Sequence, residues 1–179
     1  MKRLIYSLIA LFSILFSNCY LLYPPEVLLN KDFDGKDIAV LNFSKIGPNL
    51  PENVVILAAD KLSDALFFTG KFSVIDRSKV NDAESAMQIS TPEMLSADQI
   101  QKLGLKLKAN YLILGQVQNI SKGGLFDNDT PQEICISFRI ISVATSDVLG
   151  MATYKFSYKK NIVEKLNDAM ALIAKKMVK

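Results

Sequence analysis

The apolar residues in the first half of the chain predict two strands separated by a helix. Ile38–Phe43 is a short, nearly continuous apolar run, the pattern of a strand buried on both faces of a sheet. From Val54 to Leu66 the apolar residues recur at helical spacing, and Gly70 ends this repeat. Phe72–Asp76 is a second short strand-like run. Strand, crossover helix and strand in this order predict a βαβ unit with parallel strands.

Two more helices and a strong strand are predicted in the middle of the chain. The mixed stretch after Asp76 favours one helical segment around Val80–Met87. Ser96 and Gln99 have the spacing of a capping box, which opens a helix on the stripe Ile100, Leu103 and Leu107. Tyr111–Gly115 then forms the most apolar run after the N-terminal one, and we expect its strand to continue to Ile120.

Alternation of apolar and polar residues marks the next two strands. Ile134–Ile140 alternates cleanly, which predicts a strand with one face more buried than the other. A tight turn at Thr145-Ser146 separates it from a further strand over Asp147–Ser157. Antiparallel pairing of these two strands with the strand at Tyr111 is the simplest arrangement for consecutive strands.

The chain closes with an amphipathic helix. Asn161 and Glu164 make a cap-like start, and one apolar stripe follows at helical spacing: Ile162, Leu166, Ala169, Met170, Ile173 and Met177. We therefore predict an α/β fold, a single domain over residues 37–179. It has a mixed sheet of about five strands with helices packed on it, a βαβ start, antiparallel strands near the C-terminus and this helix at the end.

The first residues have the pattern of an export signal. Lys2 and Arg3 precede a short apolar run that ends at Cys19, which predicts a secretory signal peptide over residues 1–18. Cys19 is then the candidate for lipid attachment after cleavage. Residues 19–36 would form a lipidated tether, stiffened by Pro24-Pro25, within which Val27–Leu29 either packs on the domain or pairs as an edge strand.

Two alternatives for the N-terminal segment stay open. An ordinary signal peptide of a soluble secreted protein would favour an Ala-x-Ala cleavage site, which is absent. A retained transmembrane helix needs about 20 apolar residues. The stretch from Leu4 to Tyr23 provides that length only by burying Asn18. We favour the lipoprotein because the apolar run ends in a cysteine.

Composition excludes several classes of function. The chain contains no histidine, so it has no Ser-His or Cys-His pair and no histidine metal ligand. Its net charge of +3 includes Lys2 and Arg3, which leave with the signal, and no clustered basic face indicates nucleic-acid binding. Cys135 has no disulfide partner if Cys19 carries lipid. Its apolar sequence neighbours predict a buried, unreactive cysteine.

Three motifs suggest chemistry but lack the parts to perform it. Ser157 and Lys160 match the Ser-x-x-Lys motif of penicillin-binding proteins without the companion Lys-Thr-Gly and Ser-Asp-Asn motifs. Asp76-Arg77 more simply fixes a strand-to-helix turn by hydrogen bonding. Residues 127–129, Asp-Asn-Asp, lack the glycine and glutamate of a calcium loop and predict a hydrated turn. We therefore predict no catalytic residue, no cofactor and no metal site.

Several short motifs together resemble the CsgG-like superfamily of bacterial envelope lipoproteins. They are Ile38–Phe43, Gly70–Arg77, Leu103–Gly115 and Arg139–Val143 with the following turn. The superfamily includes CsgG, FlgO and LpoB, and the N-terminal domain of TolB shares its fold. In the superfamily, the turn after the strand that matches Arg139–Val143 usually reads Thr-Gly, where this chain has Thr145-Ser146. Residues 16–19, Phe-Ser-Asn-Cys, depart from the usual Leu-Ala-Gly-Cys lipobox and are similar to the relaxed lipoboxes of spirochaetes.

The resemblance implies a lipoprotein that faces the periplasm, most simply from the outer membrane, and that binds proteins without being an enzyme. We expect its partners to be the membrane, through the lipid on Cys19, and one or more proteins of a secretion, flagellar or cell-wall-synthesis machinery. A homo-oligomer, as a subunit of an export complex, is one alternative. A serine hydrolase that uses Ser157 and Lys160 is the alternative from a different class.

Overall fold

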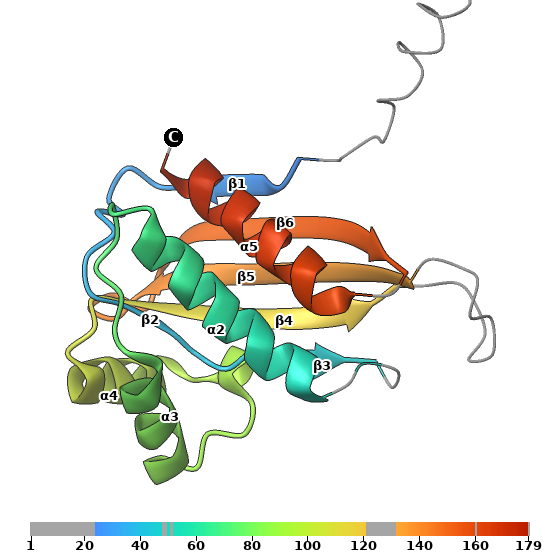
Figure 1. The fold of residues 1–179 in the computed structure, drawn as a ribbon. Coiled ribbons are helices and arrows are strands. Elements are labelled where there is room, and N and C mark those ends of the chain that lie inside the picture. The colour runs from blue at the N-terminus through green and yellow to red at the C-terminus, as the bar shows by residue number, and fades with distance from the viewer. Residues whose placement is uncertain (1–23, 48–49, 51, 121–131, 160, 179) are drawn as a thin grey trace, which may run out of the picture.

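A single six-stranded sheet organises the chain (Figure 1). The computed structural model describes all residues except 1–23, 48–49, 51, 121–131, 160 and 179. The strands are β1 (Glu26–Leu29), β2 (Ile38–Val40), β3 (Ser44–Ile46), β4 (Tyr111–Asn119), β5 (Gln132–Ser142) and β6 (Val148–Tyr158). The helices are α2 (Glu52–Phe68), α3 (Arg77–Ala86), the short 3-10 helix η1 (Pro92–Met94), α4 (Ala97–Leu107) and α5 (Ile162–Met177).

The sheet is mixed, as the sequence predicts. Its strand order is β1-β6-β5-β4-β2, and β3 pairs with β4 beyond the end of β2. β2 and β3 run parallel to β4, whereas β4, β5, β6 and β1 pair antiparallel in succession. The prediction of antiparallel strands near the C-terminus is therefore confirmed, and the sheet has one strand more than the five expected.

Two of the six strands, β3 and β1, are not among the five expected, and the strand expected at Phe72–Asp76 is lost. β1 pairs with β6 at the edge of the sheet. Its register places Leu28 opposite Met151 and Glu26 opposite Thr153. Both outcomes left open for Val27–Leu29 are observed, because the segment pairs as an edge strand and the side chains of Val27 and Leu29 pack against the core. Within the described residues, the sheet thus begins two residues after Pro24.

The predicted strand at Phe72–Asp76 is wrong in length. Only Val74 pairs, in a single parallel bridge to Ile38. The backbone of Ile38 holds this segment by donating to the carbonyl of Ser73 and accepting from the amide of Ile75. Asp76 then caps α3, so the chain leaves the sheet immediately. The βαβ direction is correct, but its second strand is reduced to one residue.

Helices cover the two faces of the sheet unequally. In Figure 1, α2 and α5 lie side by side across one face, where they bury side chains from β2, β4, β5 and β6. On the opposite face, α3 and α4 pack against apolar residues at one end: Ala39, Leu41, Leu112, Leu114, Ile141 and Val143. The second face of β5, β6 and β1 presents polar side chains and exposed Leu28 and Met151. An antiparallel sheet commonly has one such solvated face.

Local signals explain where the helices start and end. Ser96 and Gln99 form the predicted capping box at the start of α4, which ends at Lys108 in a left-handed conformation. The side chain of Asn161 accepts a hydrogen bond from the amide of Glu164 at the start of α5. Gly70 has φ +66° and its amide donates to the carbonyl of Phe67, so it ends α2 as predicted.

Candidate functional site

The structure brings few of the predicted site residues together. Cys19 and Lys160 lie outside the described residues, as does the acidic turn at 127–129. Ser157 is exposed on β6, where it faces Glu133 of β5 across the sheet. The described residues contain no group of three or more acidic or cysteine side chains that could hold a metal ion. None of the described helices has the length and apolar character needed to span a bilayer.

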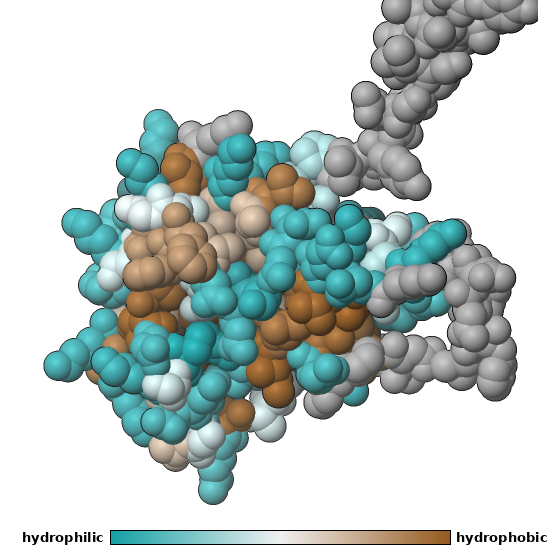
Figure 2. Space-filling view, viewed as in Figure 1, coloured by the Kyte–Doolittle hydropathy of each residue, from teal (hydrophilic) through white to brown (hydrophobic). Residues whose placement is uncertain are grey.

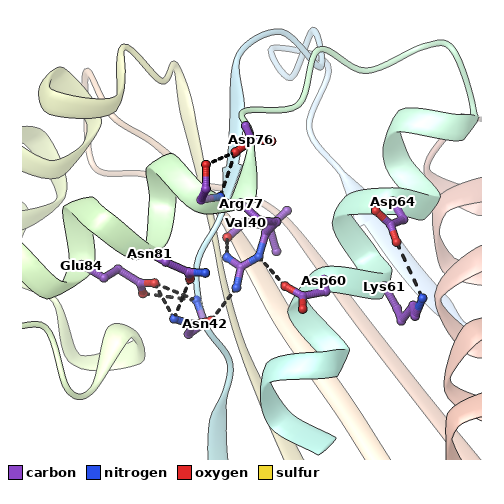
Figure 3. Close-up of polar contacts among 10 residues, drawn as sticks. Val40, Asn42, Asp60, Lys61, Asp64, Asp76, Arg77, Asn81 and Glu84 are labelled. Atoms are coloured by element: carbon purple, nitrogen blue, oxygen red, sulfur yellow. Dashed lines mark hydrogen bonds and ion pairs between the residues drawn. The ribbon is translucent and has the colours of Figure 1, made fainter. Parts of the chain in front are cut away.

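Arg77 occupies the centre of the most connected polar cluster in the described chain (Figure 3). It is the first residue of α3, and its side chain is only 14% exposed. Its Nε donates to Asp60 of α2 at 2.8 Å. Its Nη1 donates to the carbonyl of Val40 at 2.5 Å, and its Nη2 donates to Oδ1 of Asn42 at 2.5 Å. One guanidinium therefore joins α2, α3 and the end of β2.

Glu84 extends the cluster from the third turn of α3. Its side chain is buried and accepts hydrogen bonds from the backbone amide and from Nδ2 of Asn42, the latter at 2.8 Å. Asn42 Nδ2 also donates to Asn81. Burial raises the pKa of the Glu84 carboxyl, and the bonds from Asn42 and the charge of Arg77 oppose that rise. Asn42 is thus held by both Arg77 and Glu84.

The polar groups of this cluster bond mainly to one another, which stabilises the fold. All three nitrogens of Arg77 donate to protein acceptors, and the Glu84 oxygens accept from Asn42. The prediction for Asp76-Arg77 is confirmed for Asp76, whose side chain accepts from the amide and hydroxyl of Ser78. Arg77 instead turns away from Asp76 and reaches residues that are 17–37 positions distant.

Cys135 differs from its prediction in one respect. It is free but half-buried rather than buried, and Lys155 of β6 lies directly opposite. Sequence reasoning missed this basic neighbour because it comes from another strand. Burial raises the pKa of the thiol, and the Lys155 charge only partly offsets that rise. The reactive thiolate form is therefore disfavoured, which keeps the interpretation of an unreactive cysteine.

Five exposed apolar side chains lie on the outer surface of α2 and α5. They are Ile56, Phe67, Phe68, Val163 and Leu172. Figure 2 shows apolar areas over both ends of this helical layer, with hydrophilic side chains between them. The hydrophilic part includes the ion pair between Lys61 and Asp64, at 3.8 Å. These exposed side chains are separate from the buried apolar stripes of the two helices, so packing against the sheet does not explain them.

The end of α2 carries the most exposed aromatic side chains of the described chain. Phe67 is 64% exposed and Phe68 is 82% exposed. Their ring centroids lie 6.0 Å apart with an interplanar angle of 67°, an edge-to-face arrangement. Adjacent exposed aromatic rings are typical anchors of protein interfaces, where Phe, Tyr and Trp are enriched. We call Phe67 and Phe68 the aromatic pair and consider it the candidate binding site.

Known proteins share the fold of this chain. No family model matches the sequence, and neither does any curated protein. The structure is similar to the PelC dodecamer from Paraburkholderia phytofirmans, with a TM-score of 0.54, 12% identity and coverage of 84% of this chain and 96% of that one. It is also similar to lipoprotein GNA1162 from Neisseria meningitidis, with a TM-score of 0.55, 13% identity and coverage of 80% and 98%. These likenesses establish a shared fold, and membership of the CsgG-like superfamily stays a prediction.

Proposed function

We propose that this chain is an exported bacterial lipoprotein that binds an envelope protein through the aromatic pair and has no catalytic activity. Residues 1–18 are its signal peptide and Cys19 carries the lipid. The domain faces the periplasm from the outer membrane and serves as an accessory or assembly factor. One of the proteins with this fold is itself named a lipoprotein, which is consistent with the proposal.

The aromatic pair is the observation that carries the binding function. Leaving two phenylalanine rings in water forgoes about 1.5–3 kcal/mol of burial free energy for each ring. The core of α2 does not require them, because its buried stripe is complete without them: Val54, Val55, Ala58, Ala59, Leu62 and Leu66. A protein partner that covers the rings would recover this free energy, and the charged residues beside them would supply specificity.

The size of the protein extracted in detergent tests this function. We expect wild-type protein to migrate as a complex larger than a monomer, and the Phe67→Ser/Phe68→Ser variant to migrate as a monomer. Leu105→Ser is the matched control, because Leu105 of α4 is 75% exposed on the other side of the domain. A wild-type monomer, or a complex that survives the double substitution, would contradict binding through the aromatic pair.

A second copy of the chain is the alternative partner. PelC, which shares the fold, forms a dodecamer, so a homo-oligomer within an export complex is a specific version of the same proposal. Mass spectrometry of the extracted complex distinguishes the two versions, because a homo-oligomer contains this chain alone.

The lipid anchor has its own test. Metabolic labelling with a radioactive fatty acid should mark the wild-type protein and not the Cys19→Ser variant. The variant should also leave the membrane fraction or accumulate as the uncleaved precursor. Equal labelling of both proteins would refute lipid attachment at Cys19.

A further inference from the structure

We propose that the domain rests on an anionic phospholipid surface through the border formed by β1 and the last turn of α5. We call this surface the β1 border. It includes Leu28, Met151 and Lys155 on the uncovered face of the sheet, and Lys175, Lys176 and Val178 on the helical side. The inference depends on the proposed lipid at Cys19, because that anchor determines which side of the domain lies closest to the membrane.

The short distance along the chain between Cys19 and the domain is the first argument. Four residues, 20–23, separate Cys19 from Pro24, the first described residue. Even a fully extended chain of this length reaches only about 18 Å. The headgroup layer of one leaflet takes up about 5–8 Å of that reach. The remainder is smaller than the radius of gyration of about 15 Å that a domain of 150 residues has.

The second argument is where the chain enters the domain. Pro25 is buried, and its carbonyl accepts a hydrogen bond of 2.5 Å from Nζ of Lys176 in the last turn of α5. β1 follows at once as the outermost strand of the sheet. The point of entry is therefore fixed at the β1 border. Figure 1 shows β1 and the C-terminal end of α5 at one border, with α3 and α4 at the opposite one.

The third argument is the chemistry of the border. Leu28 is 74% exposed, and its cross-strand partner Met151 is 56% exposed. Lys155 follows on β6, and Lys175 and Lys176 lie in the last turn of α5. Apolar side chains flanked by lysines are typical of surfaces that lie in the membrane interface and attract anionic lipids. Glu26 is the one acidic residue of β1.

This orientation leaves the aromatic pair accessible. With β1 nearest the membrane and β2 farthest from it, the layer of α2 and α5 stands beside the sheet rather than beneath it.

Fluorescence quenching by lipids tests the β1 border in the lipidated full-length protein. A single cysteine at Leu28→Cys, in a Cys135→Ser background, is labelled with an environment-sensitive fluorophore. The protein is reconstituted in vesicles that contain phosphatidylglycerol and a headgroup spin-labelled lipid. Leu105→Cys is the matched control, because Leu105 is 75% exposed near the opposite border. We expect at least three-fold stronger quenching at position 28 than at position 105.

Equal quenching at the two positions would overturn the proposal. The mass of the reconstituted protein separates this failure from failure of the lipid anchor. If Cys19 carries lipid and the quenching is equal, only the β1 border is refuted. If Cys19 carries no lipid, the proposed anchor fails and the β1 border fails with it.

Charge reversal tests the requirement for anionic lipid. We expect quenching at position 28 to be about two-fold stronger in vesicles with phosphatidylglycerol than in phosphatidylcholine alone. Lys155→Glu/Lys175→Glu should abolish this difference, whereas Lys79→Glu/Lys106→Glu, at exposed positions of α3 and α4, should preserve it. A difference that survives the first pair of substitutions would contradict recognition of anionic headgroups by these lysines.

Discussion

Replacing Arg77 by methionine should be among the most destabilising single substitutions in this domain. Methionine keeps an apolar stem of similar length but cannot donate to Asp60, Val40 or Asn42. The carbonyl of Val40 and the Asn42 side chain would each lose a charged donor in a largely buried place, at a cost of about 1–2 kcal/mol each. The contact with Asp60 adds about 0.5–1 kcal/mol, because that carboxylate is 42% exposed and solvent screens it.

The expected loss for Arg77→Met is therefore about 2.5–5 kcal/mol of unfolding free energy. Arg77→Lys keeps the charge but lacks the planar fork that serves three acceptors, so we expect about half that loss. Equilibrium urea unfolding of the chain from residue 20, followed by circular dichroism because tryptophan is absent, measures both values. The control is Lys79→Met, an exposed substitution on α3, which should change stability by about 0.5 kcal/mol or less. A loss below about 1 kcal/mol for Arg77→Met would refute the joining role assigned to this side chain.

Three further substitutions test particular residues. Burial raises the pKa of Glu84, so the folded state binds the proton of this carboxyl more tightly than the unfolded state does. The wild-type protein therefore loses stability as the pH rises above 4.5, and Glu84→Gln removes this loss. In urea unfolding, the stability of the variant relative to wild type should increase from about pH 4.5 to about pH 8. A relative stability that stays constant over that range would contradict the raised pKa. Ser146 has φ +61° and a buried hydroxyl without a partner among the described residues, so Ser146→Gly should raise the free energy of unfolding by about 1 kcal/mol, more than Ser146→Ala does. A methyl group on Gly115 would lie 2.5 Å from the Phe43 ring, so Gly115→Ala should lower the unfolding free energy by about 1–2 kcal/mol, and Phe43→Leu in the same chain should restore part of it.

Periodicity predicted the elements whose burial is set locally. The continuous run at Ile38 became a strand whose three residues are fully buried, and the stripe from Leu166 to Met177 became the inner face of α5. Caps at Ser96 and Asn161 were likewise readable, because a cap involves residues only two or three positions apart. The departure from Thr-Gly at Ser146 also proved informative, since this residue adopts the left-handed conformation that glycine favours.

The features that the sequence could not predict depend on distant neighbours. Phe72–Asp76 is apolar enough for a strand, yet only Val74 finds a partner because Asp76 starts a helix. The partners of Arg77 and the burial of Glu84 come from pairing between segments far apart in the chain. The exposure of the aromatic pair could not be predicted either, because two phenylalanines at the end of an apolar helix resemble core residues until the position of the neighbouring helix is known.

Photocrosslinking in native membranes tests the central claim most directly. A benzophenone amino acid at position 68 should form a covalent adduct with a specific envelope protein, or with a second copy of this chain, when intact cells are irradiated. The same group at position 105 should form none, and Cys19→Ser should abolish the adduct at position 68 by removing the domain from the membrane. Adducts of equal yield at positions 68 and 105, or none at position 68, would contradict a membrane-anchored protein that binds its partner through Phe67 and Phe68.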